Sequence, residues 1–156
     1  MTNDTRAIFL DIDGTLIPFG AEAPCEQDRA ALLRARAAGH KVLINTGRSS
    51  GFLPPALRTA DYLDGFLCGC GTQLIIGGKT LFKQEIPREA LRQVLAYFLE
   101  NPGEGCFFEG ETALLTIKRT HPQGQMLTCA DDFDVRFAGE SMTKLTIWGA
   151  PTEQQR

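Results

Sequence analysis

Short apolar segments alternate with longer amphipathic ones along the first half of the chain. The apolar segments at 7–10 and 42–44 have the length of buried strands, and 26–38 between them has the length and pattern of a helix. Pro24 precedes this helix and Gly39 follows it, as is typical of helix ends. A strand, a helix and a strand at this spacing predict a parallel crossover, the basic unit of α/β folds.

The second half of the chain predicts a smaller α/β region. Gly77-Gly78 separates two β-like segments and is typical of a two-residue hairpin turn. The segment 87–100 predicts an amphipathic helix whose apolar face carries Leu91, Val94, Leu95 and Phe98. Strands are expected at 106–109, 113–118 and 145–148, and loops at 121–125 and 131–134.

Two aspartates directly follow the first apolar segment. Asp11 and Asp13 are two positions apart, so strand geometry sends both carboxylates to one side, and Gly14 allows a sharp turn. One carboxylate of such a pair can attack phosphorus, while the other protonates the leaving oxygen and later activates water. Two anions facing a phosphate need a cation, and Mg²⁺ prefers these ligands. The alternative, a calcium-binding loop, is disfavoured because apolar residues occupy 16–19.

A second group of phosphate-binding residues follows the strand at 42–44. Thr46 can donate its hydroxyl, Gly47 can present an unobstructed amide, and Arg48 can bind substrate oxygens with its forked guanidinium. The ends of neighbouring parallel strands lie side by side, in the crevice where open α/β sheets bind ligands. We therefore expect Asp11 and Thr46 to lie in the same crevice.

The segments Asp11-Ile12-Asp13-Gly14-Thr15-Leu16 and Ile44-Asn45-Thr46-Gly47-Arg48 resemble motifs I and II of the haloacid dehalogenase (HAD) superfamily, in particular its Cof-type sugar-phosphatase branch. The resemblance implies an α/β fold, with a Rossmann-like parallel sheet and an inserted C2-type α/β cap that selects the substrate. It implies that Asp11 is the nucleophile and Asp13 the general acid and base. It also implies that the Asp11 carboxylate and the Asp13 carbonyl bind Mg²⁺. The substrate-binding residues are expected to be Gly14, Thr15, Thr46, Gly47 and Arg48.

Two further motifs of the family, a catalytic lysine and an acidic loop, have no match in the sequence. Lys144 precedes a β-like segment that resembles the closing strand of the cap, so we interpret it as structural. We expect 1–76 to form part of the core, 77–149 most of the cap, and 150–156 the return to the core. The chain is then the N-terminal part of a longer phosphatase, or alternatively a natural short form.

The missing motifs have two expected consequences. In this family the motif I strand is central, and strands that come after the cap fill its second flank. Here that flank would be open, and an open apolar strand edge favours self-association. Fewer metal carboxylates would also weaken Mg²⁺ binding, so we expect low turnover from this chain.

Composition narrows the range of partners. The 156 residues are 43% hydrophobic with a net charge of −3, typical of a globular chain and without a basic surface for nucleic acid. No apolar segment approaches the roughly 18 residues of a membrane span, and the N-terminus lacks signal-peptide features, so a cytoplasmic location is expected. The five cysteines show no repeated spacing and predict reduced thiols rather than disulfides or a zinc site.

These observations favour a Mg²⁺-dependent phosphomonoester hydrolase that works through an aspartyl-phosphate. Its substrate is expected to be a small phosphorylated metabolite, with a sugar phosphate favoured. Two alternatives remain open: a phosphomutase of the same fold, and a catalytically incomplete fragment that binds a phosphate ligand.

Overall fold

The computed structural model describes residues 4–101, 105–118 and 120–148, and the chain divides into two compact units between Gln84 and Glu85. The sequence predicted this division eight residues earlier, after residue 76. The difference arises because strand β5 (Lys79–Lys83) pairs with β4 (Gln73–Ile76) and so belongs to the sheet of the first unit. The predicted return to the core at 150–156 lies outside the described residues.

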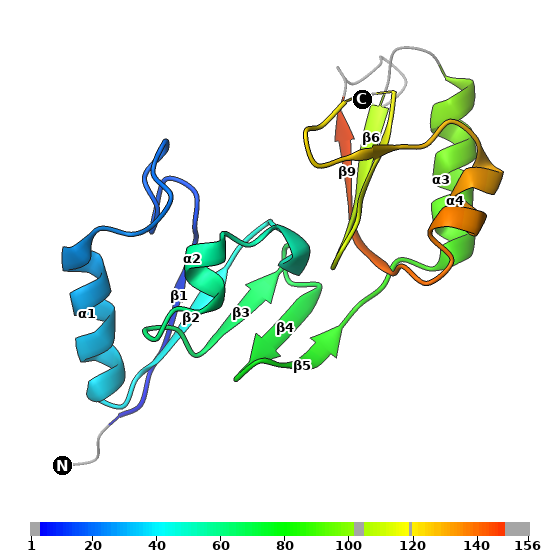
Figure 1. The fold of residues 1–156 in the computed structure, drawn as a ribbon. Helices are drawn as coiled ribbons and strands as arrows, with labels where there is room; N and C mark the ends of the chain where they lie inside the picture. Colours follow the sequence, from blue (N-terminus) through cyan, green and yellow to red (C-terminus); the bar gives the residue numbers. More distant parts are fainter. Residues whose placement is uncertain (1–3, 102–104, 119, 149–156) are drawn as a thin grey trace, which may run out of the picture. The chain divides into compact units, whose positions relative to one another are not determined.

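The first unit contains a five-stranded sheet in the order β1-β2-β3-β4-β5 (Figure 1). Strand β1 (Ala7–Leu10) pairs parallel to β2 (Lys41–Asn45), and β2 pairs parallel to β3 (Gly65–Cys68). Helix α1 (Glu26–Ala37) connects the first two strands, which confirms the predicted crossover. Strands β3, β4 and β5 are antiparallel, and Gly77 and Gly78 form the predicted turn with φ of 55° and 76°.

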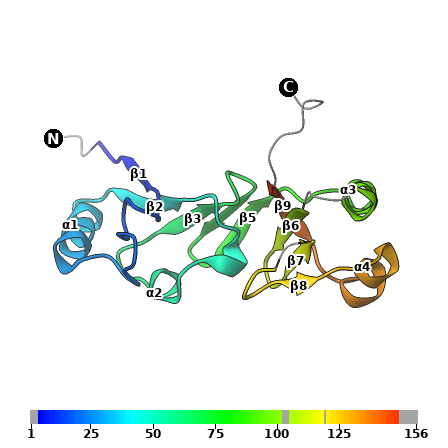
Figure 2. The same cartoon turned by 90° about the horizontal axis from the view of Figure 1, so that it is seen from above.

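Both helices of the first unit cover the same face of its sheet. Figure 2 shows α1 and the short α2 (Pro55–Arg58) beneath strands β1 to β3. The core on that face is apolar because alternate residues of each strand point toward the helices. Its fully buried members include Ile12, Val42, Ile44, Leu57 and Cys68.

Strand β1 is the outermost strand of this sheet among the described residues. Phe9 on β1 lies on the face without helices and is 52% exposed, although the residue that it pairs with, Leu43, is 6% exposed. The open flank expected for the motif I strand is therefore present in the described part of the chain. Self-association through this edge stays a prediction.

Asp64 ties the crossover helix to the sheet. Its carboxylate, 12% exposed, accepts a hydrogen bond from the Val42 amide at 2.9 Å and two from the Arg36 guanidinium at 3.2 Å each. Burial raises the pKa of this carboxyl, but the Val42 and Arg36 hydrogen bonds outweigh it, so the net pKa lies below its ordinary value. The ionised form is thus favoured by folding.

We expect Asp64→Asn to lower the free energy of unfolding by about 1–3 kcal/mol at neutral pH, as is typical for a lost charged hydrogen bond. Because the folded pKa is depressed, this stabilisation is present above the unfolded pKa and is lost as pH falls through the folded value. Urea unfolding at several pH values measures it. Asp61→Asn, at a carboxylate that is 62% exposed, is the control, and a pH-independent difference for Asp64→Asn would contradict the argument.

The second unit contains a four-stranded sheet with its helices on one face (Figure 2). The sheet order is β8-β7-β6-β9, and helices α3 (Arg88–Glu100) and α4 (Ala130–Arg136) cover it. The apolar face predicted for α3 is confirmed, since Leu91, Leu95 and Phe98 are buried. The strands are β6 (Gly105–Gly110), β7 (Leu114–Ile117), β8 (Gln125–Met126) and β9 (Met142–Trp148).

Two predictions for this unit are corrected. The acidic segment 131–134, expected to be a loop, lies within α4, because Phe133 is 1% exposed and packs into the core of the unit. The segment expected to be a loop at 121–125 ends in strand β8, which pairs parallel to β7. The structural interpretation of Lys144 is supported, since its ammonium lies 2.8 Å from the Glu109 carboxylate on the neighbouring strand.

The structure also bears on disulfides, metal-binding clusters and membrane-spanning helices. All five cysteines are free thiols. In the described ranges no three His, Cys, Asp or Glu side chains gather closely enough to hold a metal ion. No helix of the described chain combines the length and the apolar character that crossing a bilayer requires.

Candidate active site

The chain turns sharply as it leaves β1, and this turn carries both predicted catalytic aspartates. The amides of Leu16 and Ile17 donate to the carbonyls of Asp11 and Ile12, at 3.2 Å and 2.9 Å. Ile12 is 1% exposed, whereas Asp11 and Asp13 on either side of it are exposed. Burial of the intervening isoleucine therefore directs both carboxylates away from the core, as the alternation of a strand predicts.

Gly14 allows this turn for two reasons. Its φ is 74°, in the left-handed region that side chains disfavour. A Cβ atom at this position would also lie 2.7 Å from the Phe19 ring, so the ring packs directly against the glycine. The positive φ and the close contact with the Phe19 ring thus explain why glycine occupies position 14. The contact of Gly14 with substrate stays a prediction.

The loop after β2 places the second predicted group at the adjacent strand end. Thr46 is 3% exposed, and its backbone bonds to β3 and the turn beyond it, through the Leu67 carbonyl at 2.9 Å and the Cys70 amide at 3.1 Å. The Thr46 hydroxyl accepts a hydrogen bond from the Arg48 amide at 3.2 Å, which leaves the hydroxyl proton available for donation. Gly47 and Thr15 are exposed.

Arg48 joins the two loops through Asp13. Its Nη2 and Nε donate to the two oxygens of the Asp13 carboxylate at 2.6 Å and 2.9 Å, a bidentate pair. Its Nη1 also donates to the Phe52 carbonyl at 3.1 Å, so the guanidinium is held from both sides. The sequence assigned Arg48 to the substrate, and the structure shows it bound to the predicted general acid and base.

This pair sets the charge state of Asp13. The hydrogen bonds from Arg48 lower the pKa of Asp13 below its ordinary value, against the opposing effect of burial. The same hydrogen bonds raise the pKa of Arg48, and the negative charge of Asp11 contributes to that rise. The pair with Arg48 therefore favours the ionised form of Asp13.

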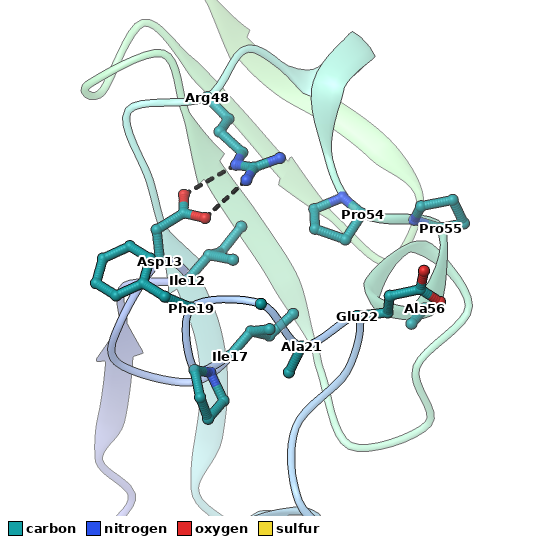
Figure 3. A pocket seen from close by; sticks show the side chains of 12 residues that line it. Ile12, Asp13, Ile17, Phe19, Ala21, Glu22, Arg48, Pro54, Pro55 and Ala56 are labelled. Atoms are coloured by element: carbon teal, nitrogen blue, oxygen red, sulfur yellow. Dashed lines mark hydrogen bonds and ion pairs between the residues drawn. The ribbon is translucent and has the colours of Figure 1, made fainter.

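A pocket of about 600 Å³ opens beside the Asp13–Arg48 pair (Figure 3). The loop 17–22 after the motif I turn and the segment 54–56 at the start of α2 form its walls. Figure 3 shows Asp13 and Phe19 on one side of the pocket, with Glu22 and Pro55 on the other. A pocket at this place can receive the group that is bonded to a phosphate held by Arg48.

The donor atoms near the turn suit Mg²⁺ in part. The Asp11 carboxylate and the Asp13 carbonyl are hard oxygen donors, and Mg²⁺ commonly takes one or two carboxylates together with water and phosphate oxygens. These residues could therefore hold the ion, although among the described residues no third acidic side chain joins them.

The structure brings most of the predicted site residues together and adds others. Asp11, Asp13, Thr46 and Arg48 lie at the ends of two paired parallel strands, as predicted. Sequence reasoning missed Phe19, Glu22 and Pro54, which line the pocket. The one signal for them was the apolar pair Pro18-Phe19 immediately after an acidic turn, where a surface loop would normally be polar.

Known proteins resemble this chain over most of its length. The family model for haloacid dehalogenase-like hydrolases matches residues 8–143. YkrA of Bacillus subtilis strain 168, whose name describes it as a candidate phosphatase, is 28% identical over 158 residues, which cover 97% of this chain and 60% of YkrA.

Two solved structures are also similar. The HAD subclass IIB sugar phosphatase BT4131 is 30% identical with a TM-score of 0.63, covering 74% of this chain and 45% of its own. A second structure, described with a trigonal-bipyramidal intermediate in a phosphoryl-transfer superfamily, is 26% identical with a TM-score of 0.62. The match covers 86% of this chain and 48% of the other. The chain thus spans between 45% and 60% of the length of these three relatives.

The family match extends over most of the chain and includes both aspartates and Arg48. The chain therefore belongs to the haloacid dehalogenase-like hydrolases.

Proposed function

We propose that this chain carries the nucleophile and the phosphate-binding loop of a Mg²⁺-dependent phosphomonoester hydrolase. The observation that carries the proposal is the meeting of Asp11 and Asp13 at the end of β1 with Thr46 and Arg48 beyond the end of β2. Two carboxylates, a hydroxyl and a guanidinium at one sheet edge provide a nucleophile, a proton carrier and phosphate ligands. The relatives named as phosphatases support the same reaction class.

The reaction proceeds in two displacements. An Asp11 carboxylate oxygen attacks phosphorus and the bond to the leaving oxygen breaks. Asp13, which takes a proton from solvent once Arg48 has moved to the phosphate, gives that proton to the leaving oxygen. A water molecule then attacks the aspartyl-phosphate. Asp13 takes a proton from this water, and the bond between Asp11 and phosphorus breaks, which releases inorganic phosphate. Mg²⁺, held by the Asp11 carboxylate and the Asp13 carbonyl, supplies neutralisation of the phosphate charge.

Arg48 has two roles in this scheme. Bound to Asp13, it lowers the pKa of that carboxyl and holds it in the ionised form. An incoming phosphate dianion competes for the same guanidinium, because planar bidentate pairing suits both carboxylates and phosphates. Transfer of Arg48 from Asp13 to phosphate allows Asp13 to carry the proton that the leaving group requires. The predicted contact of Arg48 with substrate and its observed pair with Asp13 are then successive states.

The substrate class follows from the relatives and the pocket. We propose a small phosphorylated metabolite, with sugar phosphates favoured, since one relative is described as a sugar phosphatase. A second candidate, a phosphate-binding chain with little catalysis, is favoured by one observation. The described residues contain no cluster of three acidic side chains for the metal.

Hydrolysis of p-nitrophenyl phosphate with and without Mg²⁺ tests the proposal. We expect slow release of nitrophenol that stops when EDTA removes the metal, because an unneutralised phosphate dianion repels the attacking carboxylate. Hydrolysis that persists in EDTA would contradict metal dependence. A folded sample that binds inorganic phosphate and shows no turnover would favour the second candidate.

A further inference from the structure

We propose that the pocket beside Asp13 and Arg48 selects a leaving group that is a ring and is neutral or positively charged. The inference rests on the proposed function, since it concerns the group bonded to the phosphate. It also names recognition residues within the first unit, Phe19 and Glu22, in the loop that follows the motif I turn.

The walls of the pocket favour a ring. Pro54, Pro55 and Ala56 supply apolar surface from the start of α2, and Phe19 supplies an aromatic ring from the loop 17–22. The Phe19 side chain is 85% exposed, although it packs at one edge against Gly14. An exposed aromatic ring suits stacking against a flat apolar surface. Both aromatic rings and the CH faces of sugar rings offer such a surface, whereas a short acyclic chain does not.

Glu22 gives the pocket its preference for neutral or positively charged groups. Three charged side chains line the pocket, and two of them, Asp13 and Arg48, neutralise one another in a bidentate pair. Among the described residues, Glu22 has neither a hydrogen-bond nor an ion-pair partner. A lone carboxylate on the wall attracts amino and hydroxyl donors and repels a second anionic group. Leaving groups that carry a carboxylate or another phosphate are therefore disfavoured.

The leaving group would lie between the proposed proton donor and the two recognition residues. Asp13, the proposed proton donor to the leaving oxygen, is itself part of the lining. Figure 3 places Glu22 away from Asp13, on the other side of the pocket. A ring bonded to a phosphate at Arg48 would thus extend from Asp13 toward Glu22, with Phe19 on one side.

Equilibrium binding to the unsubstituted chain in EDTA, which stops the metal-dependent hydrolysis proposed above, tests the charge preference without turnover. The probes share one ring: 4-(aminomethyl)phenyl phosphate, phenyl phosphate and 4-carboxyphenyl phosphate, which differ by one unit of charge at each step. We expect affinity to fall in that order, by about fivefold from the first to the last, because the carboxylate is solvent-exposed and its attraction is screened. Glu22→Gln should remove the order, whereas Glu26→Gln, an equal charge change outside the pocket, should preserve it.

A second variant tests the ring preference. Phe19→Ala removes a side chain that is 85% exposed, so the fold should survive. We expect it to weaken binding of phenyl phosphate by about fivefold and to leave ethyl phosphate and inorganic phosphate unchanged, since only the ring stacks on Phe19.

The outcomes separate the two proposals. The charge preference would be overturned if the three phenyl phosphates bound with equal affinity, or if Glu22→Gln left their order of affinity unchanged. The phosphatase proposal would stand in either case. Equal weakening of phenyl and ethyl phosphate by Phe19→Ala would overturn the ring preference in the same way. If inorganic phosphate does not bind to the folded, unsubstituted chain even with Mg²⁺, the proposed function fails, and this inference fails with it.

Discussion

Asp11→Asn is expected to reduce Mg²⁺-dependent hydrolysis of p-nitrophenyl phosphate by at least about a thousandfold, to the limit of detection. An amide nitrogen or oxygen cannot replace the carboxylate as nucleophile, so the first displacement has no attacking group. The side chain of Asp11 is exposed, and the backbone carbonyl, which the substitution keeps, accepts the hydrogen bond from Leu16. The turn should therefore persist.

Asp61→Asn is the matched control for this variant. It makes the same change of charge at an exposed carboxylate on the first unit that does not line the pocket. The two variants should unfold at similar urea concentrations and differ in turnover. Hydrolysis that survives in Asp11→Asn would show that another group attacks phosphorus, and the aspartyl-phosphate scheme would be wrong.

Phe108→Ala is expected to destabilise the second unit by about 3–5 kcal/mol, the range typical of removing a buried phenyl ring. Phe108 lies on β6, the inner strand between β7 and β9, and is 1% exposed among residues of both helices and the sheet. Removing the ring leaves a cavity that this small core cannot fill without moving the strand. Urea unfolding, followed by near-ultraviolet circular dichroism or amide exchange within the unit, measures the change.

Val135→Ala is the comparison for this second prediction. Val135 lies on α4 in the same unit but is 80% exposed, so its replacement should change the free energy of unfolding by less than about 0.5 kcal/mol. Similar effects of the two variants would mean that the packing described for this unit does not represent the folded chain.

Much of the fold could be predicted because its signals are local. The helix at 26–37 and the helix at 88–100 lie within one residue of their predicted ends, since proline, glycine and the spacing of apolar residues mark helices directly. The glycine pair at 77 and 78 predicted a hairpin because few other residues accept its backbone angles. Its assignment to the first unit could not be predicted, because the partner of a hairpin depends on the rest of the sheet.

Helix α4 shows why other elements were missed. Asp131, Asp132 and Asp134 give this segment the composition of a polar loop. Phe133 is buried in the core of the second unit, and Asp134 accepts hydrogen bonds from Arg88 and Arg92 on α3. Residues 42 or more positions away therefore stabilise the helix, and a reading of neighbouring residues cannot reveal them.

The sequence by itself determined the family, the order of the core elements and the positions of the two motifs that follow β1 and β2. It could do so because the chemistry depends on a few residue types at short, fixed spacings next to strands. Only the tertiary structure decided that Arg48 binds Asp13, 35 positions away, and that Phe19 and Glu22 share a pocket with them. Those contacts form where separate loops come together at the end of a sheet. The packing of the whole chain, rather than the local sequence, brings the loops together.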